Sequence, residues 1–79
     1  MNYQQKRFQI LNERINQGIA TNDEILEYLS ILREQNRISD KQIQDYNRGQ
    51  NADLILKSAL VVGGALLGLW LLSELLKNK

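Results

Sequence analysis

The sequence predicts an all-α protein in which a small N-terminal helical hairpin of two to three short helices precedes one C-terminal transmembrane helix. The first observation is a shift in composition, because residues 1–53 are polar whereas residues 54–76 are mostly apolar. The second is helical spacing of the apolar residues in the polar half, and no stretch alternates as a strand would. We therefore divide the chain into a polar helical hairpin module (1–48), a linker or helix cap (49–53), a transmembrane helix (54–76) and a short basic tail (77–79).

The first helix is predicted from the apolar residues near the start of the chain. Phe8, Leu11 and Ile15 are spaced i, i+3 and i+7, so they share one face of a helix from about residue 3 to residue 17. Gly18 follows as a suitable C′ residue, since glycine adopts the left-handed conformation that ends many helices.

Two capping boxes predict where the next helices begin. Thr21 with Glu24 and Ser39 with Gln42 fit the pattern in which a hydroxyl and a side chain three residues later cap one helix start. The second helix would pack through an apolar face and leave Leu26 and Ile31 exposed for a partner. The inner faces of the two helices consist of Ile25, Tyr28, Leu29 and Leu32 in the second, and Ile43 and Tyr46 in the shorter third, with both tyrosines expected to be half-buried.

The two corners between these helices resemble each other and a known module. Residues 18–25 are echoed 18 residues later by residues 36–43, with Asn36 in place of Gly18, an arrangement that capped helix corners can also reach independently. The first copy follows a pattern formed by Leu11, Gly18, Thr21, Glu24 and Ile25. Over residues 11–46 it resembles the SHOCT (short C-terminal domain) helical hairpin, although that family usually has Phe where Ile25 stands. The resemblance implies a helical module whose suspected role is oligomerisation, often in membrane-associated proteins, and it implies no catalytic residue.

The apolar segment is long enough to cross a bilayer. Of residues 54–76, 16 are apolar and three are glycine, and 23 helical residues reach roughly 34 Å against a hydrocarbon core of about 30 Å. The alternative is a buried helix in a soluble oligomer. Gly63, Gly64 and Gly68 favour the membrane, because glycine weakens soluble helices but is common where membrane helices approach closely.

Four residues are expected at the membrane interfaces. Lys57 would extend its charge towards the headgroups on one side, while Trp70, Glu74 and Lys77 would lie near the other. With only three residues after the segment, the layout is that of a tail-anchored protein, and we expect the N-terminal module in the cytoplasm.

The same helix carries the candidate helix–helix contact residues. Gly64 and Gly68 form a G-x-x-x-G pair, and Ala59 and Gly63 form a second small-x-x-x-small pair. Such pairs let membrane helices associate, but they also arise by chance where glycine is frequent, and both interpretations stay open.

Composition excludes much catalytic and binding chemistry. The chain has no Cys and no His, so it lacks a thiol nucleophile and the commonest general base and metal ligand. The acidic cluster Asp23, Glu24 and Glu27 has no cation-loop spacing and fits a helix start. A net charge of +1 argues against nucleic-acid binding. We expect no enzyme activity, no cofactor, no metal, no nucleic acid and no small-molecule substrate.

These observations predict a non-enzymatic, single-pass membrane protein with a structural or scaffolding role. Its partners would be the lipid bilayer and, through the N-terminal helices, either copies of itself or another protein. Two alternatives remain: a minor membrane-associated structural protein of a phage virion, and a holin-like pore former.

Overall fold

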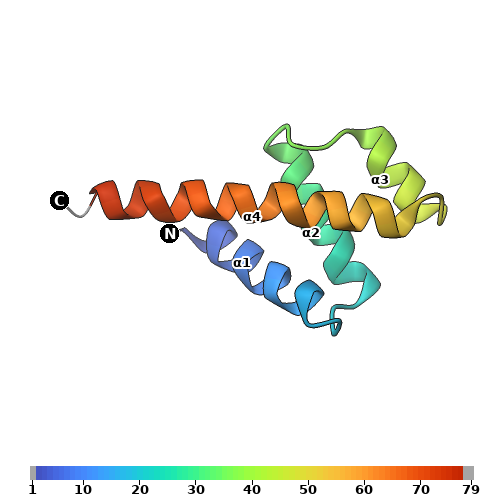
Figure 1. Cartoon of the computed structure of the whole chain (residues 1–79), viewed down its shortest axis with the longest axis horizontal. Coiled ribbons are helices and arrows are strands. Elements are labelled where there is room, and N and C mark those ends of the chain that lie inside the picture. Colours follow the sequence, from blue (N-terminus) through green and yellow to red (C-terminus); the bar gives the residue numbers. More distant parts are fainter. Residues whose placement is uncertain (1, 78–79) are drawn as a thin grey trace.

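Four helices account for most of the residues that the structure describes. The computed structural model describes residues 2–77, which form α1 (Tyr3–Asn16), α2 (Asn22–Glu34), α3 (Asp40–Asn47) and α4 (Ala52–Lys77) (Figure 1). Within that range there is no strand, and α4 is the long apolar helix, so the predicted all-α fold is confirmed.

Each of the first three helices begins at a capping box. Thr21 Oγ1 accepts the Glu24 amide at 3.2 Å while the Glu24 carboxylate accepts the Thr21 amide at 2.9 Å, and Ser39 and Gln42 make the equivalent pair at α3. Asn2 and Gln5 form a third box at α1, which the sequence analysis did not anticipate. Side chains thus satisfy amides at each helix start that have no partner inside the helix.

Residues with positive φ end the short helices. Gly18 follows α1 at φ +74°, and Asn36 follows α2 at φ +58°. Gly49 and Asn51 lie between α3 and α4 at φ +74° and +52°. Glycine and asparagine tolerate this left-handed conformation better than other residues. The chain turns here, so α3 does not continue into α4.

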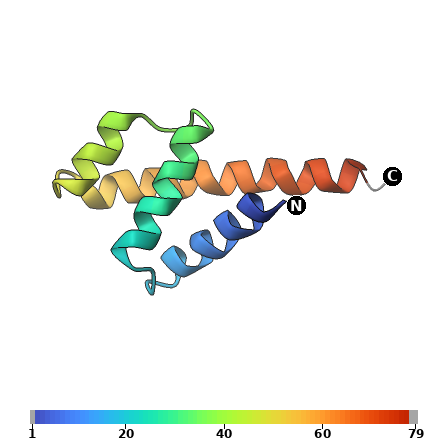
Figure 2. The same ribbon diagram turned by 180° about the vertical axis from the view of Figure 1, so that it is seen from behind.

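The second and fourth helices each pack against all the others. α2 contacts α1, α3 and α4, and α1 and α3 also contact α4 (Figures 1 and 2). Tyr28 is completely buried rather than half-buried, and Ile31 is 7% exposed, so its predicted exposure was wrong. Both differences have one cause, because α2 packs on helices at more than one side and buries more than a single face. The buried core consists of Phe8, Leu11, Ile15, Tyr28, Leu29, Ile31, Leu32, Ala59, Leu66 and Leu67.

The last helix is much longer than the others. Its 26 residues extend about 39 Å, and the molecule measures 46 Å along its longest axis. The C-terminal end of α4 projects beyond the start of α1, with α1 and α2 beside its middle (Figures 1 and 2).

Candidate functional site

One face of α4 is buried against the other helices. Ala59, Gly63, Leu66 and Leu67 are spaced four, three and one residues apart, so they lie on one side of the helix, which we call the inner face. Ala59 is 1% exposed and Leu66 is 4% exposed. The polar N-terminal half therefore covers one side of this apolar helix.

The closest approach to this face is made by a tyrosine. A Cβ built on Gly63 would overlap the Tyr28 hydroxyl, and it would lie 2.7 Å from Tyr28 Cζ and 3.0 Å from Phe8 Cζ. Tyr28 is held in place, because its hydroxyl donates a 2.8 Å hydrogen bond to Asn12 Oδ1 and its ring stacks on Phe8 at 4.4 Å. Only glycine fits at position 63 without displacing this aromatic pair.

Trp70, which was expected near a membrane interface, also contacts α1. Trp70 packs edge-on against Phe8, with ring centroids 5.5 Å apart and an interplanar angle of 75°. Such an edge-to-face arrangement is favourable for aromatic rings. α1 therefore reaches α4 as far as Trp70, two turns beyond Gly63.

The opposite side of α4, which we call the outer face, is open. No atom lies within 4 Å of a Cβ built at Gly64 or Gly68, and both glycines are exposed. The structure thus separates the two candidate contact pairs, because Ala59 and Gly63 pack inside the molecule whereas Gly64 and Gly68 do not. The large apolar side chains exposed on α4 are Leu54, Val61, Leu69, Leu71, Leu72, Leu75 and Leu76.

The remaining predicted interface residues lie towards the two ends of α4. Lys57 is exposed in the second turn, and Lys77 is exposed at the last helical residue. Glu74 is partly buried one turn from the C-terminal end. The polar groups of α4 are thus separated by the stretch at 59–72, in which every side chain is apolar.

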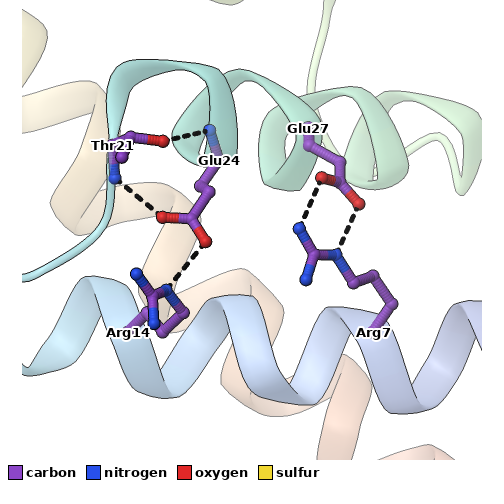
Figure 3. Close-up of polar contacts among 5 residues, drawn as sticks. All are labelled: Arg7, Arg14, Thr21, Glu24 and Glu27. Atoms are coloured by element: carbon purple, nitrogen blue, oxygen red, sulfur yellow. Dashed lines mark hydrogen bonds and ion pairs between the residues drawn. The ribbon is translucent and has the colours of Figure 1, made fainter.

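Two ion pairs join α1 to α2 (Figure 3). Arg7 donates two hydrogen bonds to the Glu27 carboxylate, at 2.9 and 3.1 Å, and this contact raises the pKa of Arg7. Arg14 Nε lies 2.7 Å from Glu24 Oε2. Glu24 therefore serves both the capping box and the ion pair, and the backbone hydrogen bond from Thr21 is the main cause that lowers its pKa.

The ion pairs divide the acidic cluster of Asp23, Glu24 and Glu27. Glu24 and Glu27 each face an arginine of α1, while Asp23 is exposed in the first turn of α2. In residues 2–77 no group of three or more acidic, histidine or cysteine side chains is arranged to hold a metal ion. The cluster in this structure stabilises the hairpin.

Comparison with protein-family models, with curated proteins and with solved structures finds no match to this chain. The SHOCT-like pattern over residues 11–46 stays a resemblance. The candidate functional site is therefore defined by its geometry alone: a helix with the length and composition to span a membrane, covered on its inner face and open on its outer face.

Proposed function

We propose that this chain is a non-enzymatic membrane protein, in which α4 is the membrane-embedded element and the three shorter helices form an interaction module at the membrane surface. The observation that carries the proposal is the outer face of α4. Val61 is 75% exposed, Leu72 is 54% exposed, and Leu75 is 66% exposed along this face. A continuous apolar surface of this kind marks a site of protein or membrane contact.

The length and composition of α4 support lipid as its main environment. Its 26 residues have a mean hydropathy of 2.0 in the most apolar window, and only 28% of that window is buried in the molecule. A core helix of a water-soluble protein would be mostly covered. The charged groups near its ends, Lys57 and Lys77, suit the two headgroup regions.

The basic residues favour a cytoplasmic position for the interaction module. Lys41, Arg48 and Lys57 precede or open the apolar segment, whereas Lys77 and Lys79 follow it. Basic residues are more frequent on the cytoplasmic side of a membrane helix. We propose that the module assembles there with a protein partner or with copies of itself, which is also the suspected role of the SHOCT modules that it resembles.

The test compares the full chain with a variant in which the outer face is charged. The full chain is expressed in a bacterial host, and its membranes are washed with alkaline carbonate. We expect the native chain to resist extraction, and Val61→Asp with Leu72→Asp to become extractable, because charged residues within a span are disfavoured, by about 2.5–3.5 kcal/mol each at its centre. Both side chains are exposed, so the helical packing should survive the change.

Ile10→Asp with Ile19→Asp is the matched control, since it makes the same change at two exposed apolar side chains outside α4. Extraction of the native chain under the same wash would overturn the proposal. Circular dichroism of each purified variant confirms that its helices are formed.

A further inference from the structure

The hairpin formed by α1 and α2 covers the part of α4 that would occupy the middle of a bilayer. Its contacts reach Gly63 through Tyr28 and Phe8, and they extend to Trp70 through Phe8. α3 lies beside the N-terminal part of the same helix (Figures 1 and 2). The covered stretch therefore runs along most of the proposed span.

The part of α4 beyond these contacts is too short to span on its own. After Trp70 the helix continues through residues 71–77, a length of about 10 Å. The hydrocarbon core is about 30 Å thick. A bilayer crossed by α4 would have to include the stretch that the hairpin covers.

The hairpin itself is unsuited to that environment. It carries the ion pairs Arg7–Glu27 and Arg14–Glu24, whose side chains are 17–41% exposed. Charged groups near the centre of a bilayer are strongly disfavoured even when they are paired. Burying the docked hairpin together with α4 would remove these groups from water.

We infer that hairpin docking and membrane spanning are alternative states of this chain, so that α1 and α2 cover the inner face of α4 in water and leave it when α4 crosses a bilayer. This inference rests on the proposed membrane function of α4. The contact that holds the docked state is the packing of Tyr28 and Phe8 against the backbone of Gly63, which we call the Gly63 contact.

Non-helical turns connect α2 to α3 and α3 to α4. The segment between α2 and α3 contains Asn36, and the segment between α3 and α4 contains Gly49 and Asn51, all with positive φ. α1 and α2 are thus connected to α4 only through α3 and non-helical turns, and the Arg7–Glu27 and Arg14–Glu24 ion pairs join the two helices to each other.

Two neighbouring glycines allow a matched test on the full chain. Gly63→Leu and Gly64→Leu change the hydropathy of α4 equally, because the substitution is the same. They differ in surroundings, since the new side chain at position 63 meets Tyr28 whereas the one at position 64 lies in open space. Each purified protein is mixed with vesicles of phosphatidylcholine and phosphatidylglycerol, and the rate at which α4 becomes resistant to carbonate extraction is measured. We expect insertion of Gly63→Leu to be about tenfold faster than that of Gly64→Leu, because its docked state is destabilised.

Equal insertion rates for the two variants would contradict the role of the Gly63 contact in holding the docked state, while leaving the proposed membrane function intact. If neither variant nor the native chain inserts, the membrane function itself fails, and the inference fails with it. The two failures are thus distinguishable in one experiment.

A second measurement reports the distance between α1 and α4 without changing Gly63, Tyr28 or Phe8. The chain has no cysteine, so Ile10→Cys and Leu72→Cys, at positions 48% and 54% exposed, can carry the only two spin labels. We expect the distance between the labels to lengthen when the vesicles are added. An unchanged distance in protein that has become resistant to carbonate would overturn the inference.

Discussion

The phenol oxygen of Tyr28 in α2 lies over the backbone of Gly63 in α4, in the space that a side chain at position 63 would fill. The tyrosine cannot move aside freely, because it stacks on Phe8 and donates a hydrogen bond to Asn12. This crossing joins the hairpin to the long helix.

We expect Gly63→Ala to lower the free energy of unfolding by about 1–3 kcal/mol, because the added methyl group overpacks the crossing. Urea unfolding of the full chain, followed by circular dichroism, measures the change. Gly64→Ala is the control and should be stabilising by up to about 1 kcal/mol, since alanine favours the helix and nothing lies within 4 Å. Equal unfolding midpoints for the two variants would show that a methyl group at position 63 is accommodated beside Tyr28.

Tyr28→Phe should partly rescue Gly63→Ala. Alone, it removes the hydrogen bond to Asn12 and should lower stability by about 0.5–1.5 kcal/mol. Combined with Gly63→Ala, it also removes the atom that the new methyl group meets first. We expect the double variant to be more stable than the sum of the single effects by about 0.5 kcal/mol or more in a double-mutant cycle. Tyr46→Phe is the control and should add to Gly63→Ala without coupling.

Burial raises the pKa of Tyr28 above the ordinary value of tyrosine. The folded state therefore favours the neutral phenol, and this contribution is fully present below the pKa of the unfolded chain. It is lost as the pH rises through the higher folded pKa. We expect unfolding midpoints to fall above about pH 10, and Tyr28→Phe to reduce that fall. If the unfolding midpoint falls equally above about pH 10 in the native chain and in Tyr28→Phe, groups other than Tyr28 cause the fall.

At acid pH the responsible group should be Glu24. The hydrogen bond from the Thr21 backbone lowers its pKa, with a further contribution from Arg14. A lowered folded pKa gives stability that is present above the ordinary carboxyl value and lost as the pH falls through the folded value. Thermal unfolding between neutral pH and pH 3 should therefore show an acid loss that Glu24→Gln diminishes. Asp23→Asn, in the same helical turn, should lose as much thermal stability on acidification as the native chain does.

The outer-face glycines give a prediction about assembly. Gly64→Ile with Gly68→Ile should leave the hairpin docked, because neither glycine contacts it. If the pair is a contact between membrane helices, the double variant should still insert but should have a smaller mass in detergent. Light scattering measures the mass, and an unchanged value would reject the contact. Ala59, on the inner face, is covered by the docked hairpin, so a substitution there would change docking as well as any contact between membrane helices.

The local elements could be read from the sequence because their signals are local. Phe8, Leu11 and Ile15 predict α1 by their spacing, and Thr21 and Ser39 stand where α2 and α3 begin. Gly18 and Asn36 have the positive φ expected of residues that end helices. Each of these features depends on side chains only a few residues apart.

The packing could not be read in the same way. Periodicity gives one apolar face to α2, but Ile31 is buried because the helix has neighbours on more than one side. The difference between Gly63 and Gly64 depends on where Tyr28 crosses, and nothing in an apolar run distinguishes two adjacent glycines. The candidate site was therefore predictable as a helix, but its division into two faces was not.

The order of the helices along the chain bears on how α4 is protected during synthesis. α1 and α2 leave the ribosome before α4, and the 26 residues of α4 take roughly 1–5 s to make. Helical proteins with local contacts fold within microseconds to milliseconds. The inner face of α4 therefore emerges next to helices that have had time to form, and the interval in which it could aggregate is short.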